Sequence, residues 1–199
     1  MKPILFSTEM VQAILDGRKT QTRRIIKIDD APENWKKSIA GTSIVRTSPY
    51  DVRLSRYNVG DILWVRETFF QENCTPDCAG RTDDDECPFK RVGDKCYGYK
   101  TQYAGGRCDG VNWRPSIFMP REAARIFLRV KSVRVQRVQD MCVADCVHEG
   151  VDVGNAWTVN AKPAFIKLWD SINVKRGYGW DANPWVWVYE FERCEGGAE

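Results

Sequence analysis

Positions 17–24 read Gly-Arg-Lys-Thr-Gln-Thr-Arg-Arg and combine residue types that bind phosphates or take part in hydrolysis. Lysine and arginine bind phosphate and carboxylate oxygens, and a threonine hydroxyl can act as a nucleophile or orient water. Lys19 could serve as the base if burial or the neighbouring cations lowered its pKa. The same run could also be a solvated strand edge that binds phosphates or nothing.

A helix is expected directly before this run. Ser7 is a good N-terminal cap, and the apolar residues of positions 8–16 recur at helical spacing, so the predicted helix ends where Gly17 supplies a C-terminal cap. From position 20 to 28 the pattern is typical of a strand. The basic run therefore begins in a turn and continues into a strand.

Strand geometry decides which of these side chains can act together. Residues three apart on a regular strand point to opposite faces, so Lys19 and Thr22 meet only if Lys19 still lies in the turn after Gly17. Two sets of side chains are expected on opposite faces of the strand, with Thr20, Thr22 and Arg24 on one face and Gln21 and Arg23 on the other.

Further elements follow along the chain. Strands are predicted at 62–70, at 125–138 as a half-exposed pair or one long bent strand, and at 185–191. Helices are predicted at 143–149, closed by Gly150, and at 164–172, with a short helical turn at 122–124. Because strands and short helices alternate without a regular strand–helix–strand rhythm, we expect an α+β fold built on a small mixed β-barrel rather than a doubly wound sheet.

Two stretches interrupt this pattern and are interpreted as insertions. The stretch at about 29–57 is polar and contains several Pro, Ser and Thr residues, and that at about 71–112 is rich in Cys, Asp, Gly and Lys, so it is not expected to form its own hydrophobic core. The chain has 199 residues, of which 43% are hydrophobic and 29% charged. It fits one globular domain, 1–199, that carries both insertions.

Four cysteines of the second insertion could hold a structural zinc ion. They are spaced Cys-x3-Cys-x8-Cys-x8-Cys, and Cys108 is a fifth candidate, the four being Cys74, Cys78, Cys87 and Cys96. Thiolates bind tetrahedral zinc, and the binding free energy could fold a segment without a core. Free or disulfide-bonded cysteines are the alternative.

The motifs together resemble those of a known family. The segment Gly-x-Lys-x-x-Thr-x-Arg after the first helix, with Lys19, Thr22 and Arg24 at its marked positions, is followed by a Gly-Asp turn entering the strand at 62–70 and later by Glu149-Gly150. This order resembles the ASCH family of the PUA-like superfamily, and the chain is similar to ASCH-like proteins carried by phages and prophages. Roughly half of the chain takes part in the resemblance.

The resemblance implies a PUA-like barrel with a cleft for RNA or a modified nucleoside. Relatives include an amidohydrolase that removes the acetyl group from 4-acetylcytidine through Lys, Thr and Glu, and members reported as ribonucleases. By position these residues correspond to Lys19, Thr22 and Glu149, with Glu67 as a rival carboxylate. Substrate contacts are expected from Arg18, Arg23, Arg24 and Glu67, and the chemistry requires no cofactor.

Alternatives to an enzyme remain open. The same cleft could hold RNA or a modified base without catalysis, or the protein could be a phage accessory protein whose cysteine-rich insertion binds a host protein. The single histidine, His148, excludes His-based triads.

Charge and hydropathy narrow the class of protein further. The net charge of +3, from 30 basic and 27 acidic residues, is too balanced to indicate nucleic-acid binding by itself. Without a signal-peptide core or a long apolar run, a cytoplasmic protein with no membrane segment is expected, in the host cytoplasm if it comes from a phage.

Overall fold

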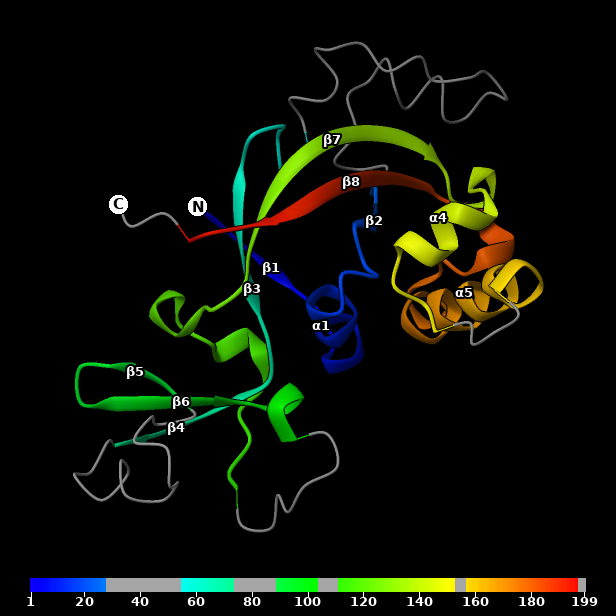
Figure 1. Cartoon of the computed structure of the whole chain (residues 1–199). Coiled ribbons are helices and arrows are strands. Elements are labelled where there is room, and N and C mark those ends of the chain that lie inside the picture. Colours follow the sequence, from blue (N-terminus) through cyan, green and yellow to red (C-terminus); the bar gives the residue numbers. More distant parts are fainter. Residues whose placement is uncertain (28–54, 74–88, 104–110, 153–156, 197–199) are drawn as a thin grey trace. The chain divides into compact units, whose positions relative to one another are not determined.

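The computed structural model describes residues 1–27, 55–73, 89–103, 111–152 and 157–196 (Figure 1). Its strands are β1 (Lys2–Leu5), β2 (Gln21–Ile25), β3 (Ile62–Arg66), β4 (Phe69–Asn73), β5 (Lys90–Val92), β6 (Lys95–Tyr99), β7 (Phe127–Arg137) and β8 (Trp185–Cys194). The α-helices are α1 (Thr8–Leu15), α4 (Val143–His148) and α5 (Trp157–Asn173). Short 3-10 turns cover Lys100–Tyr103, Ser116–Phe118, Arg121–Ala123, Val138–Asp140, Val174–Arg176 and Trp180–Ala182. The predicted insertion at about 29–57 lies almost entirely outside the described residues.

Five strands form one mixed sheet in the order β1-β3-β7-β8-β2, with β1 parallel to β3 and β2 antiparallel to β8. Together with the second, three-stranded sheet and the few short helices, this confirms the α+β class. The expected closed barrel is wrong for the described strands, because their five-stranded sheet is open and ends at β1 and β2. The β1 strand has four residues and includes Pro3, which has no N–H to donate, so it is suited to a sheet edge.

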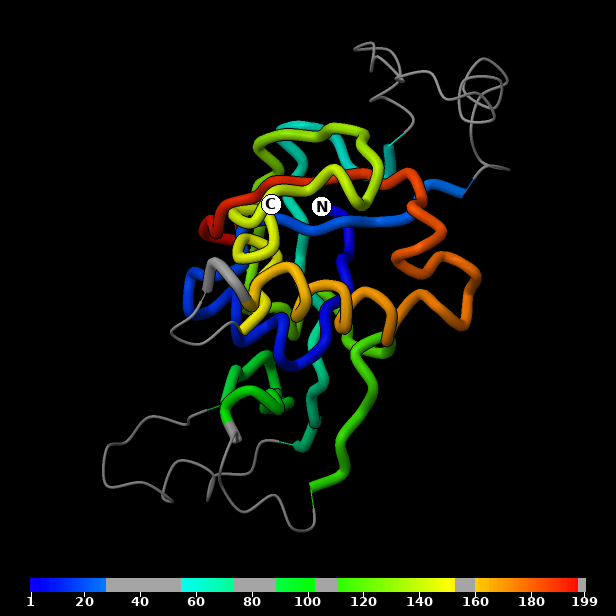
Figure 2. The backbone as a smooth tube through the Cα atoms, turned by 90° about the vertical axis from the view of Figure 1, so that its right-hand side faces the viewer, coloured from blue at the N-terminus to red at the C-terminus, as the bar shows by residue number. Residues whose placement is uncertain are grey.

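The chain divides into two compact units, one of residues 1–12, 62–128 and 193–199 and the other of residues 13–61 and 129–192. In the second unit β2 runs alongside β8 (Figure 2), with Thr22 opposite Tyr189 and Arg23 opposite Val188. The α4 and α5 helices pack on one face of these strands, burying Val138, Met141, Cys146, Ala161, Phe165, Trp169, Val186 and Val188. This apolar cluster fixes the helix that carries Glu149.

In the first unit β4, β6 and β5 form an antiparallel sheet in that order. Its buried cluster consists of Trp64, Phe69, Tyr97, Tyr99, Met119, Ala123 and Ala124. The stretch at 71–112 was expected not to form a core of its own, and in its described part Tyr97 and Tyr99, 0% and 1% exposed, pack with residues from outside that stretch. Two aromatic residues at period two were enough to anchor a segment of otherwise polar composition.

The strand predicted at 62–70 is two strands in different sheets, β3 and β4. The break falls at Glu67 and Thr68, where the Glu67 carboxylate binds the Arg125 guanidinium and the Thr68 carbonyl accepts the Lys100 N–H at 3.0 Å. Burying a carboxylate requires such partners, so the chain leaves the first sheet where Glu67 turns inward.

Several local predictions are confirmed. The Ser7 hydroxyl caps α1 by accepting the Met10 N–H at 3.4 Å, and Gly17 and Gly150 adopt φ values of +75° and +83° at the ends of α1 and α4. The stretch predicted at 125–138 contains one long strand, β7, and the short turn predicted at 122–124 lies at Arg121–Ala123. None of the described helices has the length and apolar character needed to cross a membrane.

Candidate functional site

The turn between α1 and β2 places Lys19 against the end of α4. After Gly17 reverses the chain, the Lys19 N–H donates to the Ala13 carbonyl and the Thr20 N–H to the His148 carbonyl, both at 2.9 Å. Lys19 lies in the turn before β2, which begins at Gln21, and this is the position that was predicted for it. The backbone therefore sets Lys19 beside the residue that follows His148.

A glycine allows the close approach of these two segments. A Cβ added to Gly150 would lie 2.7 Å from Lys19 Cβ and 2.8 Å from Ala13 Cβ. Together with the positive φ of Gly150, this contact leaves no room for a side chain. Gly150 thus both ends α4 and lets Lys19 reach Glu149.

The Lys19 ammonium is buried and has three acceptors. Its Nζ donates to the Gln21 carbonyl at 2.9 Å, the Glu149 carbonyl at 2.7 Å and Glu149 Oε2 at 3.0 Å. Burial lowers the pKa of Lys19 below its ordinary value, an effect that the Glu149 carboxylate opposes and that Arg24 and Arg23 reinforce. Because an ammonium has three N–H donors, this set of contacts satisfies it completely.

Arg23 ties the same carboxylate to a second acid. Its Nη1 donates to Glu149 Oε1 at 2.9 Å, and its Nη2 lies 3.2 Å from Asp145 Oδ2. The side chains of Arg23 and Glu149 are 0% and 6% exposed. Both carboxylate oxygens of Glu149 are therefore held by cations from the two ends of the basic run.

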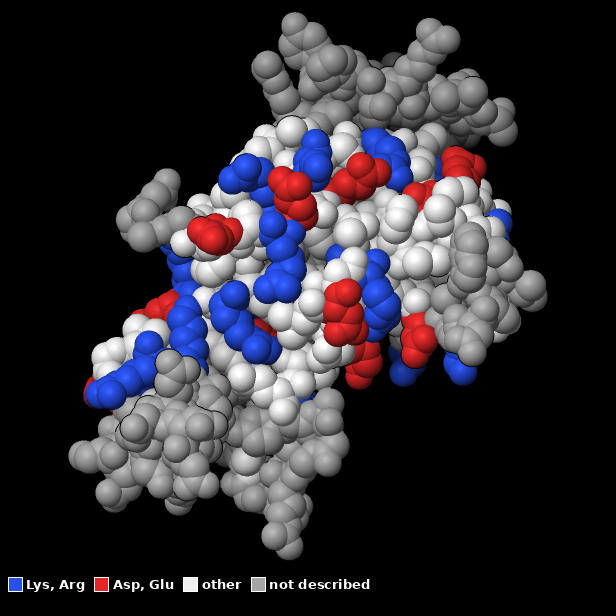
Figure 3. All heavy atoms as spheres, viewed as in Figure 1, with Lys and Arg blue, Asp and Glu red and all other residues white. Residues whose placement is uncertain are grey.

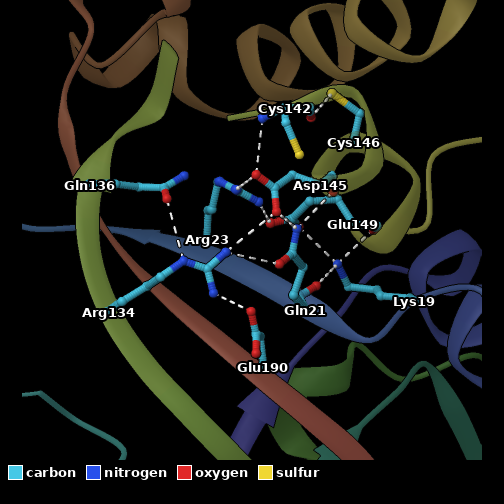
Figure 4. A network of polar contacts seen from close by, with 10 residues as sticks. All are labelled: Lys19, Gln21, Arg23, Arg134, Gln136, Cys142, Asp145, Cys146, Glu149 and Glu190. Carbon is cyan, nitrogen blue, oxygen red and sulfur yellow. Dashed lines mark hydrogen bonds and ion pairs between the residues drawn. The ribbon is translucent and has the colours of Figure 1, made fainter. Parts of the chain in front are cut away.

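Asp145 continues the network towards β7 and β8 (Figure 4). Its Oδ1 accepts the Gln21 amide at 3.0 Å and lies 3.4 Å from Arg134 Nη2, while Oδ2 caps α4 by accepting the Cys142 N–H at 3.0 Å. Burial raises the pKa of Asp145, but the hydrogen bonds from Gln21 and Cys142 and the Arg23 charge outweigh it, so the net shift is downward.

Arg134 and Glu190 close the network at the sheet. Arg134 forms an ion pair with Glu190, and the Ser132 hydroxyl donates to the same carboxylate at 2.8 Å. Although burial alone would raise the pKa of Glu190, the Ser132 and Arg134 contacts lower it. The three cations Lys19, Arg23 and Arg134 thus face the three carboxylates Glu149, Asp145 and Glu190. Formal charge is balanced, so the network does not by itself attract a phosphate.

The other face of β2 carries Thr22 and Arg24. Thr22 lies directly opposite Tyr189 in the ladder, and side chains opposite each other share a face, whereas Gln21 and Arg23 point to the network. Thr22 is buried and Arg24 exposed. The strand therefore separates Thr22 from Arg23 by face, as the alternation predicts.

Two tyrosines lie beneath this second face. The Tyr189 hydroxyl is 2.8 Å from the Ser55 hydroxyl, and the Tyr189 ring meets Tyr57 edge to face at 5.1 Å. The exposed Arg56 places its guanidinium over Tyr57 at 5.5 Å. Burial raises the pKa of Tyr189, against the lowering effect of the Ser55 hydroxyl and of the Arg24 charge. Two exposed arginines thus lie beside a rigid aromatic pair.

The remaining predicted residues have partners of their own. Arg18 is exposed and donates to Asp16 at 2.9 Å and to the Gly150 carbonyl at 3.3 Å. Glu67 belongs to the first unit, where it is 1% exposed and forms a bidentate pair with Arg125 at 2.9 Å. Of the two candidate carboxylates, Glu149 is the one in contact with Lys19.

Most of the predicted zinc ligands lie outside the described residues. Cys74, Cys78 and Cys87 belong to the stretch 74–88, while Cys96 is buried on β6. Within the described ranges, no group of three or more His, Cys, Asp and Glu side chains is arranged to hold a metal ion.

Three members of the network, Asp145, Arg134 and Glu190, were not predicted. Asp145 could have been found, because it lies three residues after the cap position of α4 and four before Glu149, so both carboxylates share one helical face. Arg134 and Glu190 join it through strand pairing, which the sequence pattern does not encode locally. The sequence thus predicted the part of the network formed by Lys19, Arg23 and Glu149, and not the part formed by Asp145, Arg134 and Glu190.

Comparison with solved structures finds similarity to the crystal structure of an ASCH domain from Lactobacillus crispatus JV V101. The identity is 10%, the match covers 92% of this chain and 69% of that one, and the TM-score is 0.39. No family model and no curated protein matches the chain.

Proposed function

We propose that this protein binds RNA or a modified nucleoside along β2, on the face that carries Thr22 and Arg24. The observation that supports this is the division of the basic run between two faces. Lys19 and Arg23 are neutralised by buried carboxylates, whereas Arg24 and Arg56 are exposed beside Tyr57 and Tyr189. Exposed guanidinium groups that are held in place by neighbouring side chains bind phosphate oxygens well.

The buried network supports this function indirectly. It holds Lys19, Gln21 and Arg23 to α4, so that β2 is fixed on the face that carries Gln21 and Arg23. A binding residue on a strand locked in this way is placed more precisely than one on a loop. The ligand contact proposed on this face is that of Arg24, because Thr22 is buried there.

Amidohydrolysis of a 4-acetylcytidine-type substrate is the second candidate, and the Lys19–Glu149 contact favours it. In this reaction a neutral Lys19 takes a proton from a water molecule that the Thr22 hydroxyl orients, and the water oxygen attacks the acetyl carbonyl. Glu149 passes the proton to the leaving cytidine amine, and acetate is released. A lowered lysine pKa beside a carboxylate suits such proton transfer, which requires Lys19 to give up one of its three acceptors.

One set of measurements tests both candidates. Labelled single-stranded RNA is titrated at several salt concentrations, and 4-acetylcytidine is incubated with the protein while cytidine is followed by mass spectrometry. Binding by the proposed face predicts that Arg24→Gln weakens RNA affinity and reduces the salt slope by about 0.7, the value for one lost phosphate contact on a single strand. The matched control is Lys175→Gln, an exposed lysine on the turn Val174–Arg176.

The outcomes separate the functions. Cytidine release that disappears in Lys19→Met and Thr22→Val identifies the amidohydrolase, and full turnover in either variant contradicts it. Salt-dependent binding without turnover identifies a reader, and cleaved RNA on a denaturing gel a ribonuclease. If neither binding nor turnover is found, the proposed function is wrong and the protein-binding alternative takes its place.

A further inference from the structure

Large apolar side chains are exposed together in the first unit. Ile117 is 56% and Phe118 66% exposed on the turn Ser116–Phe118, and Leu5 of β1 is 44% exposed. Single exposed apolar residues are ordinary, whereas a group of them marks an interaction surface. The phenylalanine ring is the most exposed of the three.

An arginine connects the turn to the sheet beneath it. Arg66 of β3 lies opposite Leu5 of β1, and its Nη1 donates to the Ile117 carbonyl at 3.2 Å. Its guanidinium stacks over the Trp64 ring at 4.7 Å. The exposed turn is thus fixed to the sheet rather than projecting from it as a loose loop.

Two more arginines flank the turn in sequence. Arg114 and Arg121 are exposed, and the only side-chain hydrogen bond recorded for either within the described ranges joins Arg121 to Met1 Sδ at 3.2 Å. None of the ion pairs among the described residues includes Arg66, Arg114 or Arg121. The neighbouring acid, Glu122, is bonded to the Tyr97 hydroxyl and lies 3.9 Å from Lys95 Nζ.

The charge pattern differs between this area and the second unit. In Figure 3, Lys and Arg side chains gather over the turns that precede β7, whereas acidic and basic side chains alternate over β7 and β8. The positive charge of the three arginines is therefore not cancelled by paired acids. We call Leu5, Arg66, Arg114, Ile117, Phe118 and Arg121 the Phe118 patch.

We propose that the Phe118 patch binds single-stranded nucleic acid, with a base stacked on the Phe118 ring and phosphates on the flanking guanidinium groups. Exposed aromatic rings among cations are the recurring elements of single-strand recognition, because every base has a face to stack and every phosphate a charge. An acidic peptide could form ion pairs with the arginines, but it does not generally carry a group that stacks on the Phe118 ring. The three unpaired arginines would instead oppose the approach of a second copy of this patch.

The test measures strand binding by fluorescence anisotropy with 12-nucleotide oligouridine and oligothymidine, each at several salt concentrations. Replacing an aromatic ring on which one base stacks by alanine costs about 1–3 kcal/mol of binding free energy. Phe118→Ala is therefore expected to weaken strand binding roughly 5- to 150-fold at unchanged thermal stability. Arg114→Gln and Arg121→Gln should each lower the salt slope by about 0.7. Ile172→Ala and Lys175→Gln, exposed residues of the second unit, are the matched controls.

This inference does not depend on the β2 site, and the same titrations keep the two apart. Strand binding that falls in Phe118→Ala but not in Arg24→Gln supports the patch even if the proposed function fails. Binding that falls only in Arg24→Gln overturns the patch and leaves the β2 site standing. Absence of strand binding overturns it too, as does a dimer in solution that Phe118→Ala converts to monomer. A difference between the two oligonucleotides tells whether the 2′-hydroxyl is read.

Discussion

At the scale of single residues, the buried network explains why a lysine can be enclosed next to α4. Lys19 is stabilised by three hydrogen-bond acceptors and Arg23 by ion pairs with two carboxylates. Among the described residues, the buried Nε and Nη2 atoms of Arg23 have no hydrogen-bond partner, so its charge is compensated by the ion pairs. Removing one member of such a network leaves its partner buried and unpaired, which costs more than the contact itself contributes. Replacing a charged residue of the network by a neutral one of similar shape is therefore expected to lower the free energy of unfolding clearly.

Asp145 offers a test in which pH reports on the network. Its pKa is lowered in the folded protein, so the stability it contributes is complete above its unfolded pKa of about 4 and is lost as pH falls through the folded value. Asp145→Asn is expected to cost about 2 kcal/mol at pH 7, since Arg23 and Arg134 lose a charged partner. Urea unfolding at pH 7, 4 and 3 should show a difference that is nearly constant down to about pH 4 and shrinks below it.

The control for this series is Asp181→Asn, an exposed acid on the turn Trp180–Ala182. It should show a small effect at every pH. A gap between wild type and Asp145→Asn that stays constant, or that widens as the pH falls, would show that Asp145 is not held as a charged acceptor.

At the scale of elements, what the sequence could predict was local. The ends of α1 and α4 were predictable because Ser7, Gly17 and Gly150 act through their own backbone geometry. The start of α5 was not, since the helix predicted from 164 begins at Trp157. The split of the strand at 62–70 was not, because it depends on Arg125, 58 residues from Glu67. The contact of Lys19 with Glu149 was anticipated only through the family resemblance, since no local pattern links positions 130 residues apart.

Gly150 provides the prediction at this scale. Gly150→Ala must adopt a positive φ and also displace Lys19 or Ala13, so it is expected to destabilise the fold by about 2–4 kcal/mol. Gly177→Ala is the matched control, because its φ of +81° is similar but nothing lies within 4 Å of the added Cβ. That variant should cost about 1 kcal/mol. Chemical denaturation of both proteins measures the difference, and equal losses would mean that the contact with Lys19 does not matter.

At the scale of the whole molecule, sequence patterns indicated the α+β class but not the open sheet. Closure would need the two end strands to pair, and that depends on strand length and position in the finished sheet rather than on the alternation within either strand. The stretch at 71–112 was predicted not to form its own core, but the sequence did not tell that Tyr97 and Tyr99 pack against Phe69 and Met119, which lie outside it. Composition thus predicts whether a segment can fold alone, and not what it can pack on.

The cysteine-rich segment leads to the last prediction. Of the four proposed ligands Cys74, Cys78, Cys87 and Cys96, the structure describes Cys96, which lies buried at 1% exposure on β6 opposite Glu72. A thiolate at that position would connect bound zinc directly to the core sheet of the first unit, so that metal binding stabilises the folded chain. We therefore expect about one zinc ion per chain by atomic emission, a lower melting temperature in chelator, and loss of both effects in Cys74→Ser.

The control is Cys142→Ser, at the exposed cap of α4. This variant should retain the metal, because Cys142 is not one of the proposed ligands, and it should retain its stability, because serine caps a helix equally well. Protein purified without zinc, whose melting temperature is the same with and without chelator, would instead identify Cys96 as a packed free thiol.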